Sequence, residues 1–327
     1  MKRRNFIQAS LGLGVWPMAA TAQHQALIWR DITFTGLGTV LTLRAAHVDA
    51  KALDFALQRA RKVIERIEDE MSLFRPDSAL SRFNASGVLI RPAADLLKIL
   101  QISQYLAKRS HGAFDVTVQP LWQLYAQAQK EGRLPAADEV DQARKKVGWQ
   151  RLLVTADRLA FAQPDMGVSL NGIAQGYAAD QVRASLVRDG VAHALINTGA
   201  WSALGLAEGR RPWILGIADP HRVDHWLTRV TMQGWSVATS ADDQCMFSAD
   251  RKHHHIFDPH TGYSPHDIAS VSVAAPTCTV ADALTKVLFV GGYDRAMHLA
   301  KAWGVLALVV HKNGNWIASD NFPHAAG

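Results

Sequence analysis

The residue best suited to phosphate chemistry in this sequence is Asp282, within the segment Ala275–Lys286. A carboxylate oxygen is a hard ligand of the kind that Mg²⁺ prefers, and beside a phosphate it would hold such an ion. The same carboxylate has a structural interpretation, because Thr279 and Asp282 have the spacing of a capping box at a helix start. The spacing alone leaves both interpretations open.

A second segment, Ser169–Asp180, carries glycines where a turn leads into a helix. The first N–H groups of a helix are free and lie at the positive end of its dipole, so the turn at Gly172 suits a phosphate group. Taken alone, the pattern N-G-x-x-x-G is a weak signal. It is not the dinucleotide fingerprint, because the spacing G-x-G-x-x-G is absent.

Three further segments combine polar and aromatic residues at loops. In Gly112–Asp115, an Asp beside an aromatic ring can hold a ligand ring and its polar edge, and an Asx-turn explains the pattern equally well. In His253–His255, consecutive strand residues point to opposite faces, so the three imidazoles cannot share one metal ion. We expect a surface loop with one functional histidine there. In Met71–Asn84, a helix exit and a capped turn account for any single residue.

Hydrophobic periodicity predicts the elements that must position these segments. A helix over about 50–72 has apolar residues on one face and charges on the other. Further helices are predicted over about 94–109, 123–150, 172–190, 279–290 and 294–303, the last one capped by Asp294. Strands are predicted at 26–34, 40–43, 152–154, 159–162, 194–197, 213–217, 226–237, 270–275, 305–310 and 315–319. Because strands and helices are interspersed without a regular βαβ repeat, the sequence predicts one α+β domain.

Composition excludes several classes of protein. The chain has 327 residues, of which 48% are hydrophobic and 20% charged, and this excludes disorder and a polytopic membrane protein. A nucleic-acid module needs a basic stripe with interleaved aromatic residues, and a serine hydrolase of the nucleophile-elbow type needs G-x-S-x-G; the mature chain has neither. Two cysteines, Cys245 and Cys278, are too few for a disulfide framework, and their pairing stays open.

The first 22 residues have the pattern of an export signal. Basic residues at positions 2–4 precede a short apolar run, and Ala20 and Ala22 frame a small-residue cleavage site. The run is too short for a permanent membrane anchor. The arginine pair resembles a twin-arginine signal for the periplasm, with an ordinary secretory signal as the alternative. Removing the three basic residues lowers the formal net charge from +6 to +3, so the mature chain, residues 23–327, is nearly neutral.

The five segments, in this order, resemble the ApbE family of periplasmic flavin transferases from about residue 26 to about 320. The motifs that carry the resemblance are MSLFRPDSALSRFN (71–84), GAFDVTVQPL (112–121), GIAQGYAAD (172–180), FDPHTG (257–262) and SVSVAAPTCTVADAL (270–284). The resemblance implies a single α+β domain over residues 23–327, with mixed and antiparallel sheets packed against helices. It also implies an activity: the enzyme binds FAD, splits its pyrophosphate with Mg²⁺ and joins FMN to a Thr or Ser hydroxyl of a partner flavoprotein.

The resemblance further assigns roles to residues of this chain. Asp282 would be a metal ligand and the base, and the backbone carbonyl of Gly172 and the position of Lys286 would complete the metal site. The residues that would line the flavin and adenine sites are Ser72, Phe74, Ala113, Phe114, Asp115, Ser169, Gln175 and His255.

Some residues depart from the family pattern close to the expected chemistry. Lys286 stands where the family has a Thr that binds Mg²⁺, and an ammonium group cannot coordinate a cation and repels it at short range. Thr285 points about 100° away around the helix and is a poor substitute. The other departures are Ser169 for Asp, Gln175 for Lys, and Ala in place of the final Gly of 197–200 and 239–241.

These departures leave three functions open. The chain could be a working FMN transferase, an FAD-binding protein without turnover, or an FAD pyrophosphatase that passes FMN to water. Lys286 could bind the pyrophosphate directly and reduce the need for a metal. We expect the transferase, because Asp282 and the Asp258-Pro-x-Thr-Gly loop are retained.

Overall fold

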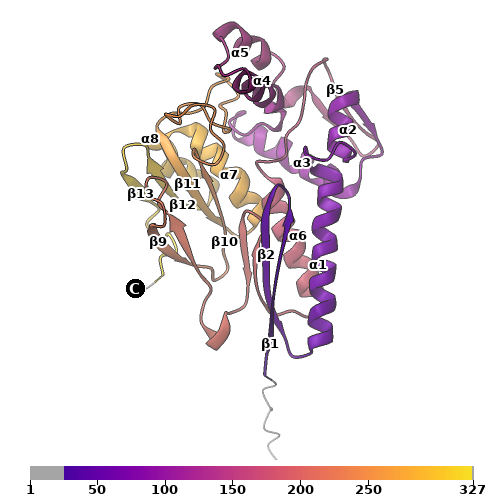
Figure 1. The fold of residues 1–327 in the computed structure, drawn as a ribbon, viewed down its shortest axis with the longest axis vertical. Helices are drawn as coiled ribbons and strands as arrows, with labels where there is room; N and C mark the ends of the chain where they lie inside the picture. Colours follow the sequence, from indigo (N-terminus) through magenta and orange to yellow (C-terminus); the bar gives the residue numbers. More distant parts are fainter. Residues whose placement is uncertain (1–25, 326–327) are drawn as a thin grey trace, which may run out of the picture.

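An eight-stranded antiparallel sheet runs through the molecule (Figure 1). The computed structural model describes residues 26–325, so the predicted export signal at 1–22 lies outside the described residues. The halves of the sheet meet at β7 and β10, where a single residue pair, Trp201 and Val237, is in register. The strand order is β1 (Ile28–Gly36), β2 (Thr39–His47), β6 (His193–Asn197), β7 (Trp201–Leu204), β10 (Ser236–Ala241), β11 (Ile268–Ala275), β12 (Leu306–His311) and β13 (Trp316–Ala318).

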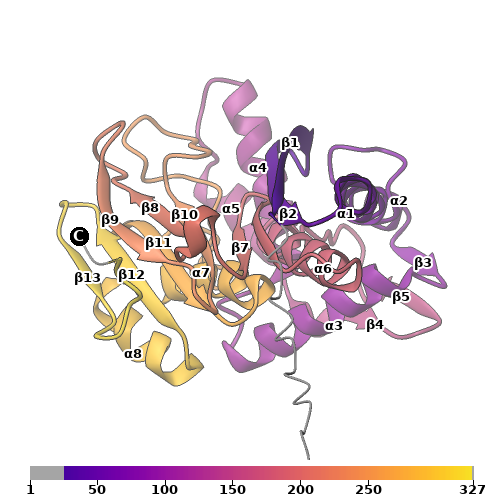
Figure 2. The same ribbon diagram turned by 90° about the horizontal axis from the view of Figure 1, so that it is seen from below.

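Helices cover one face of this sheet and bury the larger hydrophobic core. The apolar stripe of α1 (Ala50–Met71) is buried at three- and four-residue spacing, and Asp49 caps its start. α6 (Ala174–Arg188) lies between α1 and α7 (Cys278–Gly291) (Figure 2). Within residues 26–325, no helix combines the length and the apolarity that crossing a bilayer requires. The other helices are α2 (Ala79–Ser86), α3 (Ala94–Arg109), α4 (Gln119–Lys130), α5 (Ala137–Arg144) and α8 (Tyr293–Trp303).

Two small antiparallel sheets complete the fold. The hairpin of β8 (Ile214–Ala218) and β9 (Trp226–Thr231) packs on β10, β11 and β12 through a second hydrophobic cluster. The other sheet has the order β3 (Val88–Ile90), β5 (Arg158–Phe161) and β4 (Leu152–Val154), next to α2 and α3. The short 3₁₀ helices are η1 (Val116–Val118), η2 (Trp149–Arg151) and η3 (Glu208–Arg210). This arrangement confirms the predicted α+β class.

Some predicted elements differ from the observed ones. The helix predicted over 123–150 is divided into α4 and α5 by a turn that contains Gly132. The strand predicted over 226–237 is divided into β9 and β10 by a turn at Gly234, whose φ is +77°. Asp294 lies in the first turn of α8 and is not its cap. The predictions omit α2, β3 and β7, which are too short for a periodic pattern to be recognised.

Candidate functional site

A pocket lies beside the junction of β7 and β10. It is lined by the loop after α3, the start of α6, β10, the segment 244–259 and one turn of α7. Its walls combine aromatic rings with a few polar and charged groups, which is the usual composition of a pocket for a small molecule. The lining residues are Ala113, Phe114, Asp115, Val116, Val118, Trp122, Ser169, Asn171, Gly172, Gln175, Gly199, Ala238, Thr239, Ser240, Gln244, His255, Ile256, Phe257, Pro259, Asp282 and Lys286.

Most of the residues singled out from the sequence meet in this pocket. Those that line it are Ala113, Phe114, Asp115, Ser169, Gly172, Gln175, His255, Asp282 and Lys286. Ser72 and Phe74 are not among the lining residues of the described chain. Ser72 is buried at the end of α1, where its hydroxyl accepts a hydrogen bond from the N–H of Phe74 (3.1 Å), and the ring of Phe74 is exposed.

Asp282 and Lys286 form an ion pair one turn apart on α7. Lys286 Nζ lies 2.5 Å from Asp282 Oδ1 and also donates to the Asp282 backbone carbonyl at 3.1 Å. Both side chains are largely shielded from water. A Cβ atom added to Gly172 would lie 3.3 Å from Lys286 Cε, so the lysine side chain passes close over this glycine. The three residues expected at the metal site therefore converge, with an ammonium group against the carboxylate.

Asp282 also caps a helix, but not its own. Its Oδ2 accepts a hydrogen bond from the N–H of Gly176 (3.0 Å) in the first turn of α6. Asp180 of α6 in turn accepts from the N–H groups of Cys278 and Thr279 (2.9 Å each) and from the Thr279 hydroxyl (2.6 Å) at the start of α7. The capping box of Thr279 and Asp282 is therefore wrong. Each helix start is satisfied by a carboxylate of the other helix.

Asp115 is a buried structural acceptor beside the pocket. Its Oδ1 accepts from the N–H (2.8 Å) and hydroxyl (2.7 Å) of Thr117, and its Oδ2 accepts from the N–H of Trp149 (2.9 Å). Burial raises the pKa of Asp115 above its usual value, although these donors oppose the shift. The Asx-turn interpretation therefore holds for the carboxylate, and the neighbouring Phe114 is among the residues that line the pocket.

The three consecutive histidines have different environments. His254 is fully buried, with Nε2 2.9 Å from the carbonyl oxygen of Pro265, and burial lowers its pKa to about 4. His255 lines the pocket, and burial followed by the charge of Lys286 lowers its pKa to about 4. His253 is half-buried. The expected surface loop is therefore wrong, because the run is part of a packed wall, from which His255 reaches the pocket.

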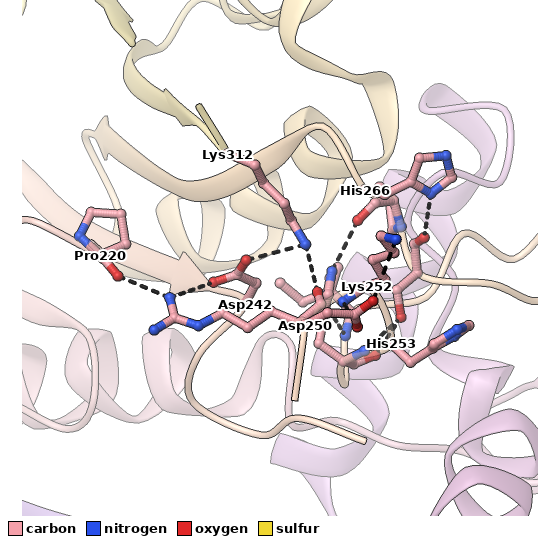
Figure 3. Close-up of polar contacts among 12 residues, drawn as sticks. Pro220, Asp242, Asp250, Lys252, His253, His266 and Lys312 are labelled. Carbon is pink, nitrogen blue, oxygen red and sulfur yellow. Dashed lines mark hydrogen bonds and ion pairs between the residues drawn. The ribbon is translucent and has the colours of Figure 1, made fainter. Parts of the chain in front are cut away.

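A buried charged cluster anchors one wall of the pocket, the segment 242–259, to the end of β12 (Figure 3). Asp242, only 2% exposed, pairs with Arg251 (3.5 Å) and Lys312 (3.3 Å). Arg251 also donates to the Pro220 carbonyl (2.9 Å), and Lys312 donates to the Arg251 carbonyl. Burial raises the pKa of Asp242, against the effect of Lys312. Because Lys312 directly follows β12, the cluster ties the pocket wall to the large sheet.

Several lining residues are absent from the predicted set. Phe257 and Pro259 lie within the motif at 257–262, and Trp122 follows the motif at 112–121 by one residue, so the motif positions were a usable signal. Gln244 lies in an irregular segment that shows no periodicity. Nothing in the sequence pattern indicates that this side chain faces the pocket.

Two residues near the expected chemistry, Thr285 and Gln175, have defined contacts. The Thr285 hydroxyl lies 2.7 Å from that of Ser240 and donates to the Asp282 carbonyl (2.6 Å). Thr285 is not among the described residues that line the pocket, and its hydroxyl is engaged by Ser240 and by its own helix. Gln175 packs on Gly199, whose added Cβ would lie 2.4 Å from the Gln175 amide group.

Cys245 and Cys278 are both free thiols. Cys278 is buried, with Sγ 3.5 Å from the Trp201 carbonyl oxygen, and Cys245 is half-buried. Burial raises the pKa of both thiols, which disfavours the reactive thiolate. Neither is a candidate nucleophile.

The pocket residues, as placed, do not fit the Mg²⁺ that the resemblance implies. One oxygen of Asp282 holds the ammonium of Lys286, and the other accepts the Gly176 N–H. An ammonium group has no lone pair to offer and repels a cation. In the described part of the chain, no three His, Cys, Asp or Glu side chains are grouped so that they could hold a metal ion.

Comparison with known proteins gives the family. A family model described as the ApbE family matches residues 37–309. The chain belongs to the ApbE family. The FAD:protein FMN transferase of Escherichia coli strain K12 is 28% identical to this ApbE chain over 291 residues, which cover 85% of the chain and 83% of that protein. The FAD:protein FMN transferase of Vibrio cholerae serotype O1 is 30% identical over 272 residues, covering 81% and 80%.

Solved ApbE structures share the fold. The flavin transferase ApbE from Vibrio cholerae superimposes with a TM-score of 0.78 at 26% identity, covering 91% of this chain and 99% of that one. The ApbE protein from Thermotoga maritima gives a TM-score of 0.83 at 25% identity, covering 91% and 100%. The resemblance stated from the motifs is confirmed.

Proposed function

We propose that this ApbE protein is an FAD:protein FMN transferase. The observation that carries the proposal is the pocket, where Asp282 and Gly172, expected near the reacting phosphates, lie with Phe114 and His255, expected near the rings. Aromatic and polar walls in one pocket match the two chemical parts of FAD, its rings and its diphosphate. Relatives that match about four fifths of the chain carry this name.

The proposed reaction moves FMN from FAD to a hydroxyl group. The oxygen of a Thr or Ser in a partner flavoprotein forms a bond to the FMN phosphorus, and the bond from that phosphorus to the bridging oxygen breaks, so that AMP leaves with this oxygen. The hydroxyl proton passes to a base, the role that the resemblance gives to Asp282. Lys286 and Gly176 hold this carboxylate in one orientation, so in this reaction the proton transfer to Asp282 would accompany release of one of these contacts.

Mg²⁺ was expected with FAD, but the pocket residues, as placed, do not fit this ion. The second candidate function is an FAD-binding protein without turnover. The pairing of Lys286 with Asp282 favours it, because this contact engages the expected base.

Incubating the mature chain with FAD and a flavoprotein acceptor, with and without Mg²⁺, tests the proposal. In-gel flavin fluorescence on the acceptor is the expected result, and an acceptor whose target Thr or Ser is replaced by Ala is the control. Free FMN and AMP without a labelled acceptor would identify a pyrophosphatase. Unchanged FAD that co-purifies with the chain would identify the binding protein.

We also propose that the chain is exported to the periplasm and meets a periplasmic or membrane flavoprotein there. The basic residues at 2–4, the short apolar run and the site at Ala20–Ala22 support this. Replacing Arg3 and Arg4 together by Lys should retain the precursor in the cytoplasm, as cell fractionation would detect. Continued export of that variant would indicate an ordinary secretory signal.

A further inference from the structure

The ammonium group of Lys286 is the cationic feature of the pocket. Among the described residues that line the pocket, there is no other lysine or arginine. An ammonium group has three N–H donors. Two are engaged by Oδ1 and the backbone carbonyl of Asp282, at 2.5 and 3.1 Å. The side chain is 18% exposed, so the remaining donor is available to a ligand while the charge is shielded from bulk water.

This ammonium lies where a cation bound to Asp282 would lie. A Mg²⁺–oxygen bond is about 2.1 Å long, and Lys286 Nζ is 2.5 Å from Asp282 Oδ1. The other carboxylate oxygen is directed to the N–H of Gly176. Two cations cannot share the Oδ1 position, because their repulsion at such a separation is large in a shielded pocket.

Local structure holds the ammonium in place. An acidic residue four positions before a lysine is the favourable order for an ion pair on a helix. The absence of a side chain at Gly172 leaves room for the lysine stem. His255 does not supply a second cation at neutral pH, because burial and then Lys286 lower its pKa to about 4.

We propose that this pocket binds FAD without a divalent cation, with the ammonium of Lys286 donating to the diphosphate in the place of the metal. The proposal rests on the proposed function, because it takes FAD as the ligand. A cation that is covalently part of the chain cannot be removed by a chelator. FAD affinity should therefore be insensitive to EDTA and should depend on residue 286.

Titration of the mature chain with FAD, followed by flavin fluorescence and calorimetry, tests this proposal. The Kd in EDTA and in Mg²⁺ is expected to agree within about twofold. Lys286→Met keeps the length of the side chain without its charge, and it is expected to weaken binding in EDTA about 10- to 100-fold, the range for losing a hydrogen bond to a charged group. Lys286→Arg should recover part of the affinity. The control Lys146→Met removes a lysine that pairs with Asp165 outside the pocket and should bind FAD like the wild type.

The variant Lys286→Thr provides a readout that does not depend on FAD. It frees Oδ1 of Asp282 and adds a hydroxyl oxygen, so it is expected to bind Mn²⁺, a paramagnetic probe of Mg²⁺ sites, detected by electron paramagnetic resonance. The wild type is expected to have no Mn²⁺ site that depends on Asp282, so the wild type and Asp282→Asn should give the same Mn²⁺ signal. The FAD affinity of Lys286→Thr should rise when Mg²⁺ is added.

Distinct results would overturn the two proposals. If the wild type binds FAD only with Mg²⁺, or binds Mn²⁺ through Asp282, then Lys286 does not replace the cation, and the proposed transferase function stands. If neither the wild type nor Lys286→Thr binds FAD under either condition, then FAD is not the ligand, and both proposals are wrong.

Discussion

Each carboxylate oxygen of Asp282 has a separate role. Oδ1 balances the charge of Lys286, and Oδ2 completes the start of α6. The spacing of Asp282 and Lys286 on one helix could be recognised in the sequence. The contact with Gly176 could not, because the two residues are 106 positions apart and only tertiary packing brings them together. Substitution of Asp282 should therefore change the stability of the protein as well as its chemistry.

Two substitutions separate these roles of Asp282. Asp282→Asn keeps an oxygen for the Gly176 N–H and loses the charge, whereas Asp282→Ala loses both. We expect the free energy of unfolding to fall by about 2–3 kcal/mol for Ala and by about 1 kcal/mol for Asn, and both variants to lose FMN transfer. Urea unfolding and the transfer assay measure the two effects. An Ala variant as stable as the wild type would contradict the capping role.

The neutral state of His255 predicts a pH dependence. Its pKa falls from the usual 6.5 to about 4 in the folded protein, so between these values the unfolded chain binds the proton and the folded chain does not. This contribution to stability is complete above pH 6.5 and is lost as the pH falls towards 4, by up to about 3 kcal/mol. In urea unfolding, the free energy of unfolding of His255→Gln should fall less than that of the wild type as the pH is lowered from 6.5 to 4.

His260 provides a control of opposite sign. Partial burial is the largest single effect and works against protonation of His260. Its hydrogen bonds to Asp258 and to the His111 carbonyl, together with the charges of Asp258 and Asp115, outweigh burial and raise its pKa. Protonated His260 therefore stabilises the folded protein below the usual histidine pKa, and this stabilisation is lost as the pH rises through the raised pKa of His260. The variant His260→Gln should change the pH profile of stability in the opposite direction to His255→Gln. The same direction for both variants would refute the assignment.

At the scale of elements, the starts of α6 and α7 are joined by their exchange of carboxylates. A sequence pattern describes a cap as local, within the first turn of a single helix, and that is why the capping-box interpretation of Thr279 and Asp282 failed. The long helices were predictable because their apolar stripes repeat over many turns. The pairing of two helix starts depends on packing between distant segments and leaves no periodic signal.

Removing Asp180 tests the exchange of carboxylates between α6 and α7, because Asp180, unlike Asp282, is not among the described residues that line the pocket. Asp180→Ala removes the acceptor for two backbone N–H groups and the Thr279 hydroxyl. We expect the free energy of unfolding to fall by about 2 kcal/mol in urea titrations. The control Asp294→Ala affects only the dipole of α8 and should cost about 0.5 kcal/mol or less. Equal losses for the two variants would contradict the exchange.

Gly176 sets the distance between the two helices. An added Cβ would lie 2.3 Å from the Cys278 carbonyl oxygen and 2.7 Å from Asp282 Cβ, and neither backbone can yield without moving a helix. Gly176→Ala should therefore separate the helix starts and weaken both caps. We expect a loss of about 3 kcal/mol or more in unfolding free energy and weaker FAD binding. A stable Gly176→Ala variant with normal FAD affinity would show that this approach is not required.

At the scale of the whole molecule, the pocket draws its walls from segments that span Ala113 to Lys286. Motifs indicated most of these segments, because each motif has a recognisable composition. The β7–β10 junction and the part of the wall at 242–252 were not predictable, since neither follows a period of the backbone. The wall depends on Asp242, whose partners come from a neighbouring loop and from the far end of β12.

Breaking this anchor should loosen the wall. Lys312→Met leaves Asp242 buried with one fewer counter-charge, and we expect a loss of about 3 kcal/mol in unfolding free energy. Amide hydrogen exchange should increase across 242–259. Asp242→Asn combined with Lys312→Met should restore part of the stability. The control Lys252→Met removes an exposed pair with Asp250 and should leave exchange in the wall unchanged.

The exchanged caps of α6 and α7 also constrain the order of folding. During synthesis, the start of α6 emerges long before residues 278–282, so its Gly176 N–H has no native acceptor until nearly the whole chain is present. The first turns of the two helices should therefore become protected together and late in refolding, while α1, capped by its own Asp49, can form early. The binding pocket is then completed only in the last folding step. A nascent chain that ends before α7 lacks Asp282 and Lys286 and therefore has an incomplete pocket.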